Sequence, residues 1–330
     1  MEDLLQINNM TIEAKEKHEN ITIVDDISLK LKYGQTLGIV GESGCGKSIT
    51  ALSILGLLRN KLSITKGEII FENANLATMN KEKLRDICGN EIGMIFQEPM
   101  TALNPLFTIG RQIIEPLRIH LKLSKKEARK RSIELLNTVG INNPEGVLKC
   151  YPFQFSGGMR QRVMIAIAIS CTPKLLIADE PTTALDVTIQ AQILQILKKL
   201  IKDRGMSLLL ISHDLGVISK LSEQIIVMYS GEIVENDTVD NIINNPLHPY
   251  TQKLLSAATE LSSDCEYLSV VNGSVPRPEE KIVGCKFSAR CEYCKDICLK
   301  QRPPLTKKST SNGLIKCWKY DSKYSLTEEN

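Results

Sequence analysis

Eight consecutive residues, from Gly41 to Ser48, combine glycines with a lysine and a hydroxyl group in the order Gly-Glu-Ser-Gly-Cys-Gly-Lys-Ser. Glycines let backbone N–H groups turn inward around phosphate oxygens, and a helix that starts near Lys47 would point its positive end at the same oxygens. Lys47 would reach the β- and γ-phosphates of a nucleotide, and the Ser48 hydroxyl would ligate Mg²⁺. The spacing therefore predicts a phosphate-binding loop.

The surroundings of this loop favour a nucleotide site over a glycine-rich turn that binds nothing. A β-rich segment ends at Val40 and an apolar helical segment follows the loop, which is the context that the pattern requires. Cys45 is expected to serve only as a small side chain in a tight loop. The residues expected to contact nucleotide here are Gly41, Ser43, Gly44, Cys45, Gly46, Lys47, Ser48 and Ile49.

Two adjacent carboxylates, Asp179 and Glu180, end the apolar segment Lys174–Ala178. A buried strand would place Asp179 beside the phosphate-binding loop, where it could hold Mg²⁺ through water. Glu180 could then polarise the water that attacks the γ-phosphate. Apolar segments that end in Asp-Glu are common, so this hypothesis depends on the phosphate-binding loop upstream.

The segments around these groups alternate between β-rich and helical patterns. The expected strands are Ile21–Val24, Ile27–Leu31, Thr36–Val40, Gly67–Phe71, Ile92–Phe96, Lys174–Ala178 and Ser207–Ile211. The expected helices include Ile49–Leu58, Ser124–Asn137, Gly158–Ser170 and Ile189–Lys202. This alternation predicts an α/β fold with a mainly parallel sheet. Helical patterns between the two halves predict an inserted α-helical subdomain over about 98–170.

Composition limits the class of protein. The 330 residues suggest two or three domains, and a net charge of +3 gives no support for a nucleic-acid or anionic-lipid partner. No apolar segment approaches the roughly 18 residues that would predict a membrane span. The first nine residues lack a basic segment followed by an apolar one, so a secretory signal is not expected. We therefore expect a cytosolic chain with reduced cysteines.

A second candidate anion site lies at 156–159, where Ser-Gly-Gly-Met opens a helical segment. With the motifs around it, this segment resembles the signature motif of ATP-binding-cassette ATPases. Gln97 matches the Q-loop glutamine of that family, Asp186 the D-loop aspartate and His213 the switch histidine. The resemblance covers about residues 4–260 and implies a P-loop NTPase core with an antiparallel β-subdomain and an inserted helical subdomain.

The resemblance also implies a nucleotide-sandwich dimer. Each ATP would lie between the phosphate-binding loop of one subunit and the signature residues Ser156, Gly157, Gly158 and Met159 of the other. Gln97 would help to ligate Mg²⁺ and sense the γ-phosphate, and His213 would hold the γ-phosphate and position Glu180. The family stacks adenine on an aromatic residue, but Ala14 occupies the matching position and His18 is the nearest ring.

Several segments narrow the resemblance to the oligopeptide/dipeptide importer ATPases. These segments are Ser48–Leu58, Phe96–Pro105, Ala184–Thr188 and Asn245–Tyr250. The sequence Ser48-Ile-Thr-Ala after the loop resembles the D-type subunit, the first type of the pair of ATPases that this group uses. The prolines of Asn245–Tyr250 are also expected to form a turn that directs the tail away from the core.

Six of the ten cysteines follow residue 260: Cys265, Cys285, Cys291, Cys294, Cys298 and Cys317. Disulfides would be unusual in a reducing compartment, so this grouping indicates a metal or a cluster cofactor. The resemblance to the same importers implies a 4Fe–4S cluster on Cys285, Cys291, Cys298 and Cys317. Structural zinc and no cofactor remain alternatives. Cys294 is additional, either a bystander or a substitute for a neighbour.

The resemblance implies an ATPase that drives the import of di- or oligopeptides from the cytoplasmic face of the membrane. Its expected partners are two transmembrane permease subunits, a paralogous ATPase or a second copy of itself, and indirectly an extracytoplasmic solute-binding protein. Residues 1–260 would form the nucleotide-binding domain and 261–330 a C-terminal region. The alternatives are a nickel or other small-solute importer, a soluble cassette ATPase, and a regulatory module with a vestigial ATPase.

Overall fold

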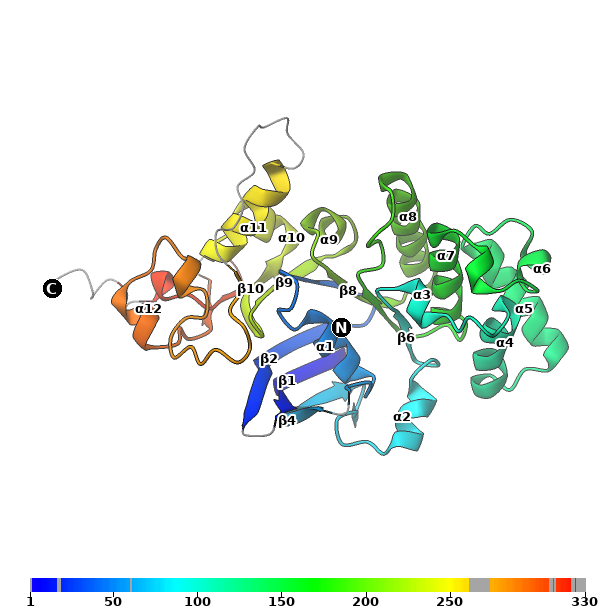
Figure 1. Ribbon diagram of the computed structural model, residues 1–330, viewed down its shortest axis with the longest axis horizontal. Coiled ribbons are helices and arrows are strands. Elements are labelled where there is room, and N and C mark those ends of the chain that lie inside the picture. Colours follow the sequence, from blue (N-terminus) through cyan, green and yellow to red (C-terminus); the bar gives the residue numbers. More distant parts are fainter. Residues whose placement is uncertain are drawn as a thin grey trace. The chain divides into compact units, whose positions relative to one another are not determined.

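The computed structural model describes residues 2–16, 19–59, 61–260, 274–308, 311, 313–321 and 324 (Figure 1). His18 and Cys265 lie outside the described residues. The chain divides into two compact units. The helical unit comprises Met1–Leu4, Leu31–Thr36 and Thr78–Ile211. The β-rich unit comprises Leu5–Lys30, Leu37–Ala77 and Ser212–Asn330.

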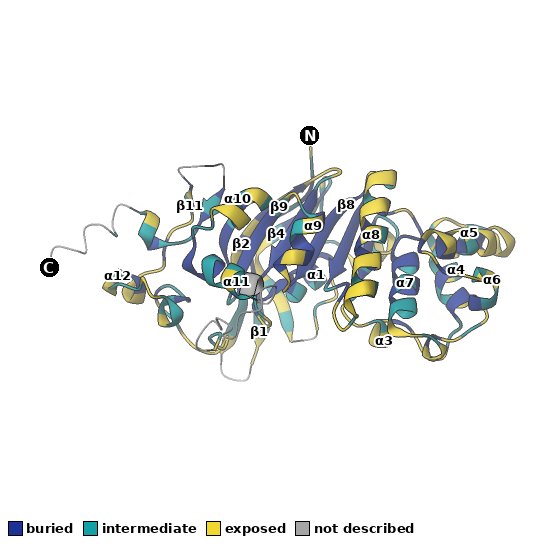
Figure 2. Cartoon of the chain, turned by 90° about the horizontal axis from the view of Figure 1, so that it is seen from above, coloured by how far each residue is buried: buried dark blue, intermediate teal, exposed yellow. Residues whose placement is uncertain are grey.

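The helical unit is built on three neighbouring parallel strands, β6 (Ile92–Ile95), β7 (Leu175–Asp179) and β8 (Ser207–Ser212). Their continuous apolar sequences suit strands that are covered on both faces, and every residue of β7 and β8 is buried. Figure 2 shows β8 in the colour of buried residues, whereas the outer face of the helix α8 is exposed.

Helices fill the interval between β6 and β7, as the sequence predicts for an inserted helical subdomain. They are α3 (Pro99–Ala102), α4 (Ile109–His120), α5 (Lys125–Thr138), α6 (Pro144–Val147) and α7 (Gly157–Ala168). The unit also contains α2 (Lys81–Ile87), the 3₁₀ helix η1 (Pro152–Gln154) and α8 (Val187–Arg204). Ser124 and Glu127 form a capping box that starts α5, and Gly205 in the left-handed region ends α8.

The β-rich unit contains an antiparallel sheet in the order β2-β1-β4-β5. Its strands are β1 (Asp3–Lys15), β2 (Asn20–Lys32), β4 (Leu62–Phe71) and β5 (Ala74–Asn75). The two short strands expected between residues 21 and 31 are one strand, β2, so the prediction of a break there is wrong. Asp26 has a φ of 50°, but the strand continues through it, so this residue is a local irregularity of β2 and not a turn.

A second group of strands in the β-rich unit has the order β11-β12-β10-β9-β3. The strands are β3 (Thr36–Val40), β9 (Gln224–Tyr229), β10 (Glu232–Thr238), β11 (Thr306–Lys307) and β12 (Leu314–Ile315). β3 and β9 are parallel, and β12 pairs antiparallel with β10 through Glu235↔Ile315 and Asn236↔Leu314. The C-terminal segment therefore extends the same sheet as the strand that leads into the phosphate-binding loop.

The helices of the β-rich unit are α1 (Lys47–Ile54), α9 (Leu215–Leu221), α10 (Val239–Asn244), α11 (Pro249–Glu260) and α12 (Asp296–Lys300), with η2 (Ser288–Arg290) and η3 (Trp318–Tyr320). α1 ends four residues before the predicted helix does, because Gly56 adopts a left-handed conformation just beyond it. Among the described residues, no helix is both long and apolar enough to cross a membrane.

Candidate nucleotide site

The phosphate-binding loop joins β3 to α1 within the β-rich unit, as the sequence predicts. Gly41 is required by a close approach: a Cβ there would lie 2.2 Å from the carbonyl oxygen of Met228. Gly46 precedes α1 with a φ of 100°, a left-handed conformation that favours glycine. The two glycines let the loop close tightly against β9 and aim the N-terminus of α1 toward its centre.

Lys47 is buried at the loop, and its ammonium group donates hydrogen bonds to the carbonyl oxygens of Gly41 (2.7 Å) and Glu42 (2.9 Å). The charge is thereby held where phosphate oxygens are expected to bind. Cys45 is completely buried, and burial raises the pKa of its thiol although Lys47 acts in the opposite direction. Its packing in the loop agrees with the interpretation of Cys45 as a small filler.

In the helical unit, β7 ends at Asp179, which is buried and pairs with Ile211 of β8, and Glu180 follows directly. The Glu180 carboxylate accepts hydrogen bonds from Gln97 Nε2 (2.9 Å) and Thr183 Oγ1 (2.8 Å). The φ of Glu180 is 45°, an uncommon conformation for a residue with a side chain and one often found at functional sites. The structure therefore brings together the proposed catalytic carboxylate and the proposed γ-phosphate sensor.

The signature segment begins α7. Ser156 is its N-cap, and its hydroxyl oxygen accepts a hydrogen bond from the backbone N–H of Met159 at 3.4 Å. A Cβ on Gly158 would lie 2.8 Å from Ile189 Cγ2, so this glycine permits close packing of α7 on α8. Gly157 is exposed at the same helix end, which leaves the first turn accessible to an anion.

Asp186 and His213 have different local surroundings. Asp186 is the N-cap of α8, and its carboxylate accepts a hydrogen bond from the Ile189 N–H at 2.9 Å. His213 is exposed in the turn that precedes α9, whose N-cap is Asp214. The structure thus places His213 and the phosphate-binding loop in the β-rich unit. It places Gln97, Asp179, Glu180, the signature residues and Asp186 in the helical unit.

Two contacts to the phosphate-binding loop were not predicted from the sequence. The Tyr250 hydroxyl accepts a hydrogen bond from the Glu42 N–H at 2.8 Å, and the Arg290 guanidinium pairs with the Glu42 carboxylate. No spacing in the sequence indicates either contact, since Arg290 follows Glu42 by 248 residues. Ala14, at the expected adenine position, lies on β1 opposite Leu62.

The four cysteines named above as cluster ligands line one cavity. They are Cys285, Cys291, Cys298 and Cys317. The walls of the cavity also include Phe287 and Trp318, whereas Cys294 is not among the lining residues. Burial raises the pKa of Cys285 to about 12 and that of Cys317 to about 11. Among the described residues, no group of three or more His, Cys, Asp or Glu side chains is placed to hold a metal ion. The donor set is nevertheless the one that an iron–sulfur cubane uses.

His248 is a buried titratable group on the wall of this cavity. Its Nδ1 accepts a hydrogen bond from the Tyr250 N–H at 3.0 Å, which fixes the neutral tautomer. Burial lowers the pKa of His248 to about 3, although a hydrogen bond to the Lys316 backbone acts in the opposite direction. The folded chain therefore keeps this imidazole neutral over a pH range in which the unfolded chain protonates it.

This buried histidine predicts an acid-sensitive fold. The unfolded state binds an extra proton below pH about 6.5, so the free energy of unfolding should fall as the pH decreases from there toward about 3. Between pH 7.5 and 5.5 the loss from this one group should be about 1.4 kcal/mol. Urea unfolding at both pH values measures it, and His248→Gln should remove that part of the slope. An unchanged slope in the variant would contradict the assignment.

Two family models match the chain. The ABC transporter model matches residues 24–183, and the model of the oligopeptide/dipeptide transporter C-terminal region matches residues 234–298. The oligopeptide transport ATP-binding protein AppD of Bacillus subtilis (strain 168) is 48% identical to this chain, over 97% of this chain and 98% of that protein. The dipeptide transport ATP-binding protein DppD of Escherichia coli (strain K12) is 45% identical over 92% of each chain.

Solved structures match the same fold. The dimeric post-hydrolysis structure of the ATP-binding cassette MJ0796, bound to ADP and Pi, has a TM-score of 0.65 and 31% identity over 71% of this chain and 98% of that one. The structure of cbiO1 from Clostridium perfringens has a TM-score of 0.62 and 25% identity over 74% of this chain and 92% of that one. The P-loop fold of the ABC ATPases predicted from the sequence is thereby confirmed.

The fold and the phosphate-binding loop together define an ATPase of the ABC transporter class. Within that class, the chain belongs to the oligopeptide/dipeptide transporter family of ATP-binding proteins.

Proposed function

We propose that this chain is the ATP-hydrolysing subunit of an importer for di- or oligopeptides. The observation that carries the proposal is the similarity to AppD, whose name denotes oligopeptide transport, over 97% of this chain. In this proposal residues 1–260 form the nucleotide-binding domain and 261–330 the C-terminal region of the importer subunit. The cargo is tested by purifying the membrane complex and measuring ATP hydrolysis with peptide-loaded binding protein. Stimulation by nickel or another small solute and not by peptide would favour the alternative importer.

The site residues have complementary roles in the proposed reaction of ATP and water to ADP and phosphate. Lys47 and the loop N–H groups bind the phosphates, while Ser48, Gln97 and Asp179 supply the oxygen donors that Mg²⁺ prefers. Bound Mg²⁺ would neutralise charge on the β- and γ-phosphates. Glu180 accepts a proton from the attacking water. Gln97 and Thr183 donate hydrogen bonds to the Glu180 carboxylate and hold it in one orientation.

The remaining motif residues act in the assembled dimer of the proposal. His213 holds the γ-phosphate from the same subunit, and the end of α7 at 156–159 binds the nucleotide of the other subunit. Asp186 lies at the dimer contact while it also caps α8. The second subunit is either a paralogous cassette or another copy of this chain.

The proposed importer places this ATPase on the cytoplasmic face of the membrane against two permease subunits. The segment after Gln97 is well suited to receive a permease, because Met100, Thr101 and Leu106 are exposed there and Leu103 is buried. Cysteines introduced at 101 or 106 should crosslink to the permease in the assembled complex, as detected by mass spectrometry. Crosslinks that reach only the ATPase partner would contradict this placement. A cysteine at the exposed residue Lys122, just beyond the C-terminal end of α4, serves as the control.

The proposed cofactor of the C-terminal region is one 4Fe–4S cluster. The four thiols that line the common cavity support it, since four cysteine thiolates are the ligand set that would hold such a cluster. Their raised pKa values mean that loading would release protons, so cluster content should fall in acid.

Metal analysis of protein purified without oxygen tests the cluster. About four iron and four sulfide per chain are expected, and Cys298→Ser should remove most of the iron because Cys298 is a buried cavity residue. Cys294→Ser is the matched control and should leave the iron content intact. Zinc without iron in the native chain would exclude the cluster.

A further inference from the structure

We propose that Arg290, in the cysteine-bearing C-terminal segment, positions the phosphate-binding loop through Glu42 and thereby sets the affinity for ATP. The proposal rests on the proposed function only in that ATP binds at this loop. Arg290 lies outside the sequence motifs by which the chain resembles the cassette ATPases.

The pair between Arg290 and Glu42 has the geometry of a strong ionic contact. Arg290 Nη1 lies 2.7 Å from Glu42 Oε2, and Nη2 lies 3.0 Å from Oε1. The arginine side chain is only 6% exposed. Two parallel N–H···O bonds of a planar guanidinium fix the direction as well as the distance of the carboxylate. Glu42 is the second residue of the loop, so this contact acts directly on the phosphate-binding backbone.

The backbone of Glu42 is held from the same side. Its N–H donates to the hydroxyl of Tyr250, a fully buried residue at the start of α11. Arg290 Nη1 also donates to the Tyr229 hydroxyl at 3.3 Å, and the rings of Tyr229 and Tyr250 lie 4.7 Å apart. Glu42 is thus clamped at both its side chain and its main chain by residues that are fixed to each other.

Arg290 is itself held by the C-terminal segment. It ends η2, its carbonyl oxygen accepts a hydrogen bond from Lys253 Nζ at 3.0 Å, and Phe287 at the start of this turn packs edge-on against Tyr229 at 5.2 Å. Cys285 and Cys291, which bracket the turn, both line the cysteine cavity. The residue that pairs with Glu42 is therefore adjacent in the chain to a cysteine of that cavity.

Removing the guanidinium should weaken ATP binding more than it slows the chemical step. The lost contact restrains the loop and touches neither the attacking water nor Glu180, which lies in the other unit. A charged hydrogen-bonded contact of this kind corresponds to a rise of about tenfold or more in Kd. Lysine has a point charge in place of the planar fork, so Arg290→Lys should restore only part of the affinity.

The test measures the Kd of the full-length chain for a fluorescent ATP analogue, with KM and kcat in the assembled transporter. Arg290→Met and Glu42→Gln should each raise Kd and KM about tenfold, with kcat changed less than about twofold. The double variant should be no worse than either single one, because both remove the same contact. The matched control is Arg302→Met, which breaks another ion pair of the C-terminal segment, with Asp25, without contact to the loop.

Each outcome is decisive. Glu42 is half-buried, and Glu42→Gln keeps the shape of its side chain. A Kd of this variant within about twofold of the native value would overturn the inference even if Arg290→Met misfolds. An equal loss in Arg302→Met would show a general effect of tail docking and would also overturn it. Failure of the native chain to bind the ATP analogue would overturn the proposed function itself, whereas failure to transport peptide would leave this inference intact.

Discussion

Replacing Glu180 with glutamine is expected to lower ATP hydrolysis about 10²–10⁴-fold while ATP binding persists. Glutamine retains the shape of the side chain and can keep the contacts to Gln97 and Thr183, so the positive-φ turn at Glu180 should survive. Glutamine lacks the carboxylate that we propose accepts a proton from the attacking water. The variant should therefore accumulate as an ATP-bound closed dimer.

Phosphate release by the assembled transporter measures the rate, and size-exclusion chromatography with ATP and Mg²⁺ measures the dimer. Glu145→Gln, which changes an exposed carboxylate on α6 of the same unit, is the matched control and should hydrolyse ATP normally. Near-native turnover in Glu180→Gln would show that another group activates the water.

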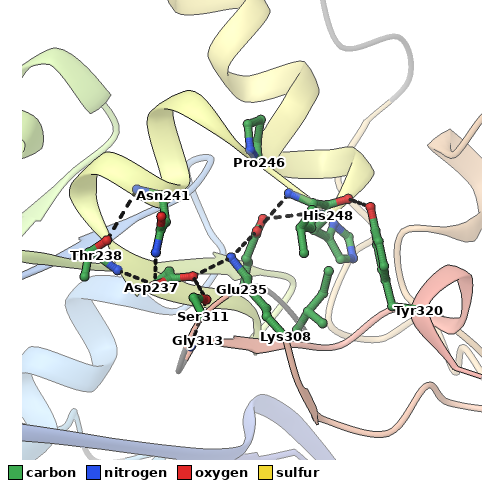
Figure 3. Close-up of polar contacts among 12 residues, drawn as sticks. Glu235, Asp237, Thr238, Asn241, Pro246, His248, Lys308, Ser311, Gly313 and Tyr320 are labelled. Carbon is green, nitrogen blue, oxygen red and sulfur yellow. Dashed lines mark hydrogen bonds and ion pairs between the residues drawn. The ribbon is translucent and has the colours of Figure 1, made fainter.

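Replacing Lys308 with methionine should reduce the free energy of unfolding by about 3–5 kcal/mol, the usual cost of breaking a buried ion pair. Figure 3 shows Lys308 between two acidic side chains of β10. Its ammonium nitrogen lies 2.8 Å from Glu235 Oε1 and 3.1 Å from Asp237 Oδ2. The Lys308 side chain is 1% exposed and the Glu235 side chain is 0% exposed. Water therefore cannot solvate the carboxylates that lose their cation.

Both carboxylates keep other hydrogen-bond donors in the variant but lose their cation. Glu235 accepts hydrogen bonds from the N–H groups of Leu247 and His248. Burial raises the pKa of Asp237, but hydrogen bonds from Asn241, Ser311, the Thr238 backbone and Lys308 itself outweigh burial, and the net pKa is lowered in the native chain. The variant would thus leave two buried carboxylates without a cationic partner beside the strand that the C-terminal segment joins.

Urea unfolding followed by fluorescence of Trp318, in the C-terminal segment, measures the loss. Lys307→Met is the matched control, because Lys307 is the exposed residue directly before Lys308 in the chain. Adding Glu235→Gln to Lys308→Met should recover part of the stability by removing one unpaired charge. A loss no larger than that of the control would mean that the ion pair contributes little to the docking of the C-terminal segment.

The sequence by itself determined the parts of this protein whose geometry is local. The phosphate-binding loop, the strand before it and the helix after it are contiguous, so glycine spacing and an apolar pattern suffice to predict them. The acidic end of β7, the helix that opens at 156–159 and the helical insertion were predicted for the same reason. Boundaries failed where one residue changed the backbone, as at Asp26 within β2 and Gly56 beyond α1.

The tertiary structure alone decided which distant residues support the site. Glu42 and Arg290 are separated by 248 residues, and Lys308 by more than seventy from the acidic strand that it neutralises. No sequence pattern indicates either pair. A contact between remote segments depends on how the chain folds, here on the pairing of β12 with β10, and not on spacing along the sequence. The convergence of four cysteines on one cavity has the same origin. They lie in or beside η2, α12 and η3, and they meet because the C-terminal segment packs against β9 and pairs with β10.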